Sequence, residues 1–282
     1  MIITTISELR NYLKVHRAKN RTVGLVPTMG FLHEGHLSLI RRAKAENDVV
    51  VVSDFVNPTQ FGPNEDYETY PRDIERDTGL AVGAGGDVVF YPSVTEMYPD
   101  GSATFVEVEG NITRVLCGAS RPTHFKGVTT VVNMLFNIVK PDKAYFGQKD
   151  AQQAAVLMKM VRDTHQDIEL VVCPIAREED GLAMSSRNTY LNEEERKQAT
   201  ILNQALAEGE KAFLAGETAV EKLVSVIADK IKEMPLAEID YVDIYDFPSL
   251  TEIKEIERQA LAAVAVKIGK TRLIDNRILR EE

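Results

Sequence analysis

Alternation of short apolar segments with helical stretches is the feature that most constrains the fold of this 282-residue chain. The expected strands cover residues 22–27, 49–55, 87–91, 143–146 and 168–173, and the expected helices cover residues 36–45, 71–82, 128–139 and 151–162. Such alternation predicts βαβ units with right-handed crossovers, and therefore a parallel sheet with helices packed on it. Residues 104–109 interrupt the rhythm, so we expect them to leave the main sheet.

Composition changes after Pro174, which indicates a second domain. The expected features there are a polar stretch, two charged helices and two strands, over residues 177–181, 193–215, 219–233, 239–245 and 262–268. A chain of this length is also large for a single hydrophobic core. We therefore predict an α/β fold, with a doubly wound parallel sheet in residues 1–175 and a smaller α+β domain in residues 176–282.

The charge of the chain excludes some classes of partner. The formal net charge is −10 and the pI is about 5.2, which argues against nucleic acid or an anionic membrane as a main partner. The N-terminus lacks a signal-peptide pattern, and no apolar stretch is long enough to span a bilayer, so we expect a cytoplasmic protein. Cys117 and Cys173 form no CxxC pattern, and we expect both to be buried, reduced thiols.

The segment Pro27–His36, of sequence PTMGFLHEGH, lies where an expected strand ends and a helix begins. Ligands of doubly wound folds bind at that edge, and the start of a helix offers backbone N–H groups to a phosphate. Gly30 and Gly35 allow close approach of the backbone, and His33 and His36 are spaced to face the same way and donate hydrogen bonds to a reacting phosphate. The alternatives are a capped core helix and a metal-binding pair. Neither a Walker A loop nor a GxGxxG fingerprint occurs.

A second polar segment, MSSRN at residues 184–188, follows the flexible acidic stretch at the expected domain boundary. Its two hydroxyls and one guanidinium suit the β- and γ-phosphates of a nucleotide, and a mobile loop there can close over ATP. The alternative is a helix start capped by Asn192.

Two further segments carry polar groups at expected strand ends. In FGQKDAQQ, residues 146–153, Lys149 suits the charge of a triphosphate and Asp150 a ribose hydroxyl or metal ion, although a charged surface turn is the alternative. In FVNPTQFG, residues 55–62, the amide of Gln60 offers both a donor and an acceptor to a hydroxy acid.

Together these segments resemble the pantothenate synthetase (pantoate–β-alanine ligase) family, within the HxGH nucleotidyltransferase superfamily. The matching pieces are PTMGFLHEGH (27–36), FVNPTQFG (55–62), YPRD (70–73), RPTHFKGV (121–128), FGQKDAQQ (146–153) and MSSRN (184–188), in the family's order. One departure is Gln148, where the family commonly has Glu. The resemblance implies a Rossmann-like N-terminal domain, a smaller C-terminal lid domain and a homodimer.

The resemblance also implies a role for each matched residue. The catalytic residues would be His36, His33, Lys149 and Arg187. The ATP-binding residues would be Met29, Gly30, Phe31, Leu32, His33, Glu34, Gly35, His36, Gly147, Gln148, Lys149, Asp150, Ala176, Met184, Ser185, Ser186 and Arg187. Gln60 and Gln153 would bind pantoate, and Gln60 would also lie near β-alanine. No metal ligand is assigned.

The implied reaction is that of an AMP-forming ligase of coenzyme A biosynthesis. Pantoate, β-alanine and ATP with Mg²⁺ would give pantothenate, AMP and pyrophosphate through an enzyme-bound pantoyl adenylate. Two alternatives share the histidine site: a nucleotidyltransferase that moves AMP onto a phosphate acceptor, and a non-catalytic nucleotide sensor. The first gives no reason for Gln60 and Gln153, and the second need not keep both histidines.

Overall fold

The computed structural model describes residues 1–63 and 65–280, and these residues fall into two compact units. The first unit takes its described residues from Met1–Val108, Arg121–Gly147 and Val156–Pro174. The second unit takes them from Glu109–Ser120, Gln148–Ala155 and the chain from Ile175 onward. The division into domains at residue 175 stays a prediction, since the second unit also draws on two earlier segments.

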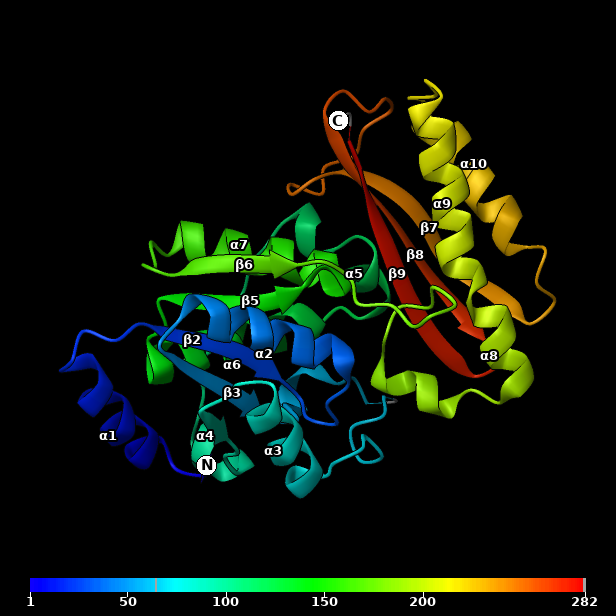
Figure 1. Ribbon diagram of the computed structural model, residues 1–282. Helices are drawn as coiled ribbons and strands as arrows, with labels where there is room; N and C mark the ends of the chain where they lie inside the picture. The colour runs from blue at the N-terminus through cyan, green and yellow to red at the C-terminus, as the bar shows by residue number, and fades with distance from the viewer. Residues whose placement is uncertain (64, 281–282) are drawn as a thin grey trace. The chain divides into compact units, whose positions relative to one another are not determined.

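A parallel sheet forms the centre of the first unit (Figure 1). Its strands are β1 (Ile2–Ile3), β2 (Val23–Thr28), β3 (Val49–Asp54), β4 (Val88–Phe90), β5 (Lys143–Gly147) and β6 (Glu169–Cys173). Within the described residues the order is β1-β4-β3-β2-β5-β6, with every neighbouring pair parallel. The predicted α/β fold with a parallel sheet is confirmed. The chain builds outward from β2 through β3 and β4, then returns to β5 on the other side of β2, so the β2–β5 junction is a topological switch point.

Helices cover both faces of this sheet because alternate strand residues are apolar on each side. The main helices are α1 (Ile6–Arg17), α2 (Glu34–Glu46), α3 (Ile74–Gly83), α6 (His124–Val139) and α7 (Ala151–Asp163). Val49 and Val51 of β3 belong to a core cluster with α1 and α6, whereas Val50 and Val52 belong to one with α2 and α3. Each such buried valine stabilises the fold by about 1.5–3 kcal/mol.

The second unit contains an antiparallel sheet and the helices that pack on it. Its strands are β7 (Ala237–Asp246), β8 (Gln259–Ile268) and β9 (Thr271–Arg280), and its longer helices are α8 (Glu193–Ala199), α9 (Ile201–Leu214) and α10 (Val220–Ile231). Leu202, Leu206 and Ile227 of the helices share a core with Val264 and Val266 of β8. The predicted α+β character of this region is confirmed.

Shorter helices occur in the connections. They are η1 (Pro58–Gln60), α4 (Val94–Met97), η2 (Asn111–Thr113), α5 (Cys117–Ser120), η3 (Gln148–Asp150) and η4 (Ser186–Tyr190). The single helix predicted over residues 193–215 is wrong, because Thr200 separates α8 from α9. Residues 104–109 lie outside the main sheet, as expected, and hydrogen bonds with the hydroxyls of Thr129 and Thr130 hold Val106 on α6.

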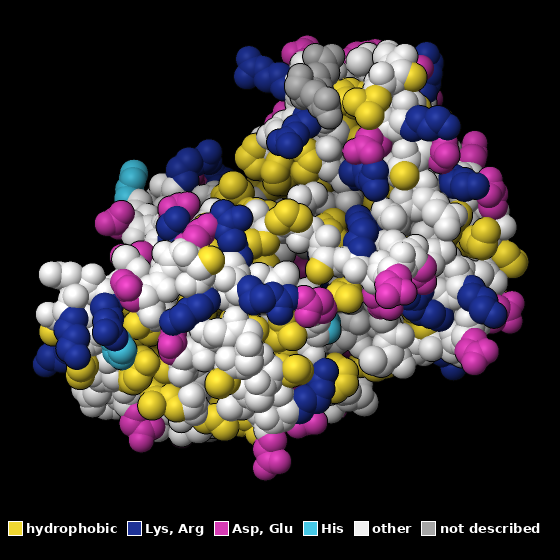
Figure 2. Space-filling view, in the orientation of Figure 1, with side chains coloured by type: hydrophobic (Ala, Val, Ile, Leu, Met, Phe, Trp, Pro, Cys, Tyr) yellow, Lys and Arg dark blue, Asp and Glu magenta, His cyan; other side chains and the backbone are white. Residues whose placement is uncertain are grey.

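The expectations from composition concern the cysteines, membrane-spanning segments and the distribution of charge. Both cysteines are free and buried. No helix within residues 1–63 and 65–280 is long and apolar enough to cross a membrane. On the face shown in Figure 2, Lys and Arg side chains are interspersed with Asp and Glu rather than gathered in one basic patch.

Candidate active site

The loop between β2 and α2 leaves the sheet at the switch point, and its shape requires glycine. Gly30 has φ of +79°, and a Cβ atom there would lie 2.3 Å from Oδ1 of Asp54 at the end of β3. Phe31 follows with φ of 48°, also in the left-handed region. The chain therefore turns sharply directly after Thr28, and the predicted phosphate loop lies at the carboxyl edge of the sheet.

Asp77 on α3 binds the backbone of this loop. Its carboxylate is almost fully buried and accepts hydrogen bonds from the backbone N–H groups of Phe31 and Leu32, the latter at 2.8 Å. Arg76 donates to the same carboxylate at 3.0 Å and to the carbonyl of Leu32 at 2.8 Å. Neither residue was predicted from the sequence, although an aspartate within the predicted helix over residues 71–82 was a possible signal. They fix the backbone that leads into His33.

His33 and His36 together form the start of α2. His33 is the N-cap, and its Nδ1 accepts from the N–H of Gly35 at 3.2 Å. Nδ1 of His36 accepts from the N–H of His33 at 3.3 Å, and the ring centroids are 4.1 Å apart. Because Nδ1 is an acceptor in each ring, the neutral form carries its proton on Nε2. The helix cap is therefore present, and each ring also carries an Nε2–H donor.

A metal-binding pair was the other alternative for these histidines. Within residues 1–63 and 65–280 there is no group of three or more His, Cys, Asp or Glu side chains arranged to hold a metal ion. The oxygens of Asp77 already accept backbone N–H groups and a guanidinium. In the described part of the chain, the two histidines therefore belong to no such group.

A second buried carboxyl group lies against the same loop. Asp54 is 5% exposed, and burial raises its pKa to about 7, with a further upward contribution from the charge of Asp77. Burial is also the largest cause that raises the pKa of Asp77. Near neutral pH the underside of the loop therefore carries less negative charge than two ordinary aspartates would give.

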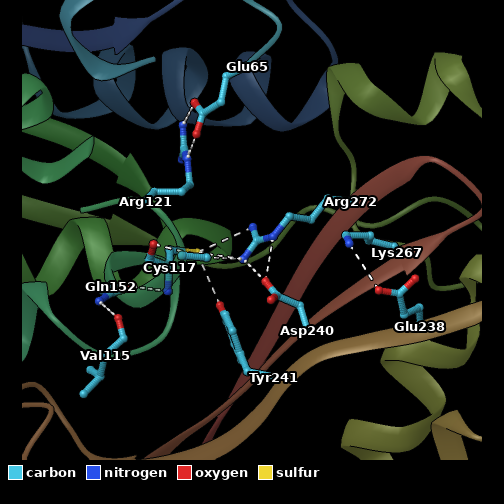
Figure 3. Close-up of polar contacts among 11 residues, drawn as sticks. Glu65, Val115, Cys117, Arg121, Gln152, Glu238, Asp240, Tyr241, Lys267 and Arg272 are labelled. Carbon is cyan, nitrogen blue, oxygen red and sulfur yellow. Dashed lines mark hydrogen bonds and ion pairs between the residues drawn. The ribbon is translucent and has the colours of Figure 1, made fainter. Parts of the chain in front are cut away.

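Gln60 lies beside Met29, so the first unit brings two of the predicted site residues together. Nε2 of Gln60 donates to Sδ of Met29 at 3.2 Å, and Oε1 accepts from Nδ2 of Asn57 at 3.0 Å. The carbonyl of Gln60 is 2.9 Å from Nδ1 of His124 and accepts from Arg121, whose guanidinium pairs with Glu65 (Figure 3). These contacts fix both the backbone and the amide of Gln60.

The turn after β5 carries the next predicted group. Gly147 ends β5 in the first unit, and η3 begins the adjoining part of the second. Nζ of Lys149 is 3.7 Å from Oδ2 of Asp150. The amide of Asn276 on β9 donates to the carbonyls of Gln148 and Lys149, at 2.9 Å each. Asn276 was not predicted from the sequence, because it lies 127 residues from Lys149.

Gln153 follows on the first turn of α7, and its neighbour Gln152 anchors that turn. The buried amide of Gln152 donates to the carbonyls of Ile112 and Val115, at 3.0 and 2.7 Å, and accepts from the N–H of Cys117 at 3.0 Å (Figure 3). The start of α7 is thereby tied to residues 109–120 within the second unit.

The segment that contains Ala176 folds back on the Ser-Ser-Arg segment. The N–H of Met184 donates to the carbonyl of Ala176 at 3.0 Å, and Ser185 caps η4 by accepting from the N–H of Arg187 at 3.3 Å. Asn192 accepts from two backbone N–H groups at the start of α8, so the predicted cap is confirmed. The cap lies downstream of residues 184–187 and does not use their side chains.

Comparison with known proteins places the whole chain in one group. The family described as Pantoate-beta-alanine ligase matches residues 1–278. The pantothenate synthetases of Acetivibrio thermocellus and Thermotoga neapolitana are each 58% identical over 278 residues, with 99% of both chains covered in each comparison.

Solved structures give the same result. The pantothenate synthetase of Thermus thermophilus superimposes with a TM-score of 0.94 at 46% identity, covering 99% of each chain. The pantoate–β-alanine ligase of Francisella tularensis, solved with β-γ ATP and β-alanine, superimposes with a TM-score of 0.77 at 36% identity, covering 99% of this chain and 97% of its own.

Proposed function

The chain belongs to the pantoate–β-alanine ligase family, and we infer from this membership that it condenses pantoate with β-alanine in an ATP-dependent reaction. The observation that carries the inference is the full-length match, at 58% identity over 99% of a curated pantothenate synthetase. The reaction has two steps. A carboxylate oxygen of pantoate attacks the α-phosphorus of ATP and pyrophosphate leaves, giving pantoyl adenylate. The amine of β-alanine then attacks the adenylate carbonyl, releasing AMP and a proton as the amide forms.

We assign phosphate binding in the first unit to the segment Met29–His36. The Nε2–H donors of His33 and His36 lie at a helix start, where backbone N–H groups and the helix dipole also favour an anion. Such donors lower the barrier when charge develops on the phosphate during adenylation. His36 is proposed as the principal donor, with His33 beside it.

Gln60 is proposed to bind pantoate and to lie near β-alanine. Its amide oxygen is already used by Asn57, whereas its amide nitrogen donates to the weak acceptor Sδ of Met29. A substrate oxygen can replace that sulfur and gain a stronger hydrogen bond. Gln153, on the first turn of α7, is proposed as the second pantoate-binding amide.

In the second unit, we assign ATP binding to Gln148–Asp150, Ala176 and Met184–Arg187, with Gly147 preceding them at the end of β5. Lys149 and Arg187 are proposed to neutralise phosphate charge. Mg²⁺ would be held mainly by phosphate oxygens and water. Asp150 would supply a carboxylate beside Lys149. A homodimer and a cytoplasmic location are also proposed, the first from the family resemblance alone.

Pantoate-dependent exchange of radiolabelled pyrophosphate into ATP tests the proposed function. We expect exchange only when pantoate is added, and AMP rather than ADP as the product once β-alanine is present. ADP formation would contradict the adenylate mechanism. Exchange that needs a phosphate-bearing acceptor would indicate the nucleotidyltransferase, and absence of any turnover would indicate the nucleotide sensor.

A further inference from the structure

Asn276 occupies an unusual position for a polar side chain. It lies within β9, opposite Ala263 of β8, and is only 4% exposed. A buried amide needs hydrogen-bond partners, because leaving its donors unmet costs about 1–3 kcal/mol for each group. Its partners therefore indicate why an asparagine stands there.

Those partners belong to the turn that carries Lys149. Nδ2 of Asn276 donates to the carbonyls of Gln148 and Lys149, at 2.9 Å each, and Oδ1 accepts from Nε2 of Gln148 at 3.4 Å. The first carbonyl belongs to the peptide unit before the Cα of Lys149, and the second to the peptide unit after it. Since each peptide unit is planar, the pair of hydrogen bonds restrains both planes that meet at this Cα. The direction of the Cα–Cβ bond of Lys149 follows from those two planes.

We propose that Asn276 is a positioning residue for adenylation, which aims the side chain of Lys149 by holding the two carbonyls that flank it. The proposal rests on the function assigned to Lys149 above. Asn276 touches no reacting atom in this scheme and acts only through the turn. Asparagine suits the task because one NH₂ group supplies both donors, whereas aspartate would place an oxygen against two carbonyl oxygens.

A double-mutant cycle in the full-length protein tests this, with pantoate-dependent pyrophosphate exchange as the readout. We expect Asn276→Asp to reduce exchange roughly tenfold to a hundredfold, because two buried hydrogen bonds are lost. In the Lys149→Ala background the same substitution should change the remaining exchange by less than about threefold, because the lysine side chain that Asn276 would position is absent. Transfer of preformed pantoyl adenylate to β-alanine should be nearly unchanged in Asn276→Asp.

Leu279→Val is the matched control for stability. Leu279 lies on the same strand, is 1% exposed and belongs to the core cluster of the second unit. The substitution should lower the melting temperature by about 2–6 °C while leaving exchange at 25 °C unchanged. If Asn276→Asp does not fold, Asn276→Ser keeps one donor and is expected to lose about tenfold in the same cycle.

Several results would overturn the proposal. Normal exchange in the Asn276 variants is one, and an equal loss of rate in both half-reactions is another. A loss of exchange that multiplies with the loss in Lys149→Ala is the third. Normal exchange in Lys149→Ala itself is the fourth. A wild-type protein without pantoate-dependent exchange would instead refute the proposed function. The two failures are therefore distinguishable.

Discussion

At the scale of single residues, the two histidines combine a structural task with the proposed chemical one. Each Nδ1 accepts a backbone N–H at the start of α2, and this fixes the ring and leaves the proton on Nε2. A substitution can separate the structural task from the chemical one only if the new side chain still accepts the hydrogen bond from the backbone N–H group.

His36→Ala is expected to reduce turnover about a hundredfold or more, because a donor to the reacting phosphate is lost. His36→Asn is the informative companion, since its amide oxygen can still accept from the N–H of His33 and keep the helix cap. Both variants should keep the wild-type circular dichroism spectrum. Turnover within a few-fold of wild type in His36→Ala would remove this residue from its proposed role.

Asp54 makes the stability of the first unit depend on pH. Its pKa is about 7 in the folded protein, against 3.8 for an ordinary aspartate, so the folded state binds more protons between these values. The free energy of unfolding should therefore fall as pH rises from about 4 to about 7, by up to about 4 kcal/mol from this group. The pKa of Asp77 is also raised, which acts in the same direction.

Asp54→Asn should remove that dependence. We expect the variant to be more stable than wild type by about 1–3 kcal/mol at pH 8, and the difference to shrink towards pH 5. Urea unfolding at both values measures it. An equal difference at the two pH values would show that Asp54 does not ionise in this range.

At the scale of elements, the contact between α6 and η1 sets the position of Gln60. A Cβ atom at Gly127 would lie 2.4 Å from the carbonyl oxygen of Thr59 and 2.6 Å from Cα of Gln60. The close approach of these two elements therefore depends on glycine within a helix, where it otherwise weakens the fold.

Gly127→Ala is expected to displace η1 and raise the KM for pantoate about tenfold, with a loss of about 1–3 kcal/mol in stability. Gly79→Ala on α3 is the matched control, since a Cβ atom there meets nothing within 4 Å. It should be neutral or slightly stabilising, with wild-type kinetics. An unchanged KM for pantoate in Gly127→Ala would argue against the placement of Gln60 in the substrate site.

Most elements could be predicted from the sequence because the apolar residues of each follow the period of one type of element. The valines of β3 are an example, since they alternate between two apolar faces. β9 was not predicted because six of the ten residues in its sequence, TRLIDNRILR, are polar, and it has no long apolar run. Two of its polar residues, Asp275 and Asn276, are buried and contact Arg177 and the Lys149 turn. No local pattern reveals partners so far away in sequence.

The candidate site, like the fold, could be predicted only in part from the sequence. Motifs gave the proposed site residues, from His33 to Arg187, but not the residues that hold them. Asp77, Asn276 and Gln152 make their decisive contacts with backbone groups 35 to 128 residues away. A backbone carbonyl or N–H has no signature in sequence, so such supports become visible only in three dimensions.

At the scale of the whole molecule, the second unit is not a continuous stretch of chain. Residues 109–120 contribute Cys117, whose Sγ is 3.3 Å from Oη of Tyr241 and 3.8 Å from both terminal nitrogens of Arg272 (Figure 3). Burial raises the pKa of Tyr241 well above its usual value, so its hydroxyl stays neutral in this cluster. The earlier segments thus make polar contacts with β7 and β9 of this unit.

A fragment of residues 176–282 should therefore be less stable than the same region in the intact chain, by at least about 2 kcal/mol. Without residues 109–120 and 148–155, it lacks Cys117, which contacts Tyr241 and Arg272, and the two carbonyls to which Asn276 donates. Urea unfolding followed by circular dichroism checks this. A cooperative transition at the midpoint of the intact protein would instead support a domain boundary at residue 175.

The discontinuity of the second unit also has a consequence on the ribosome. Residues 109–120 leave the exit tunnel long before β9, which supplies Arg272. At a synthesis rate of about 5–20 residues per second, they wait roughly 8 to 30 seconds for that strand. During translation the nascent chain therefore exposes Cys117 and its neighbours to solvent, and the turn that carries Lys149 lacks the support of Asn276 until β9 has left the tunnel.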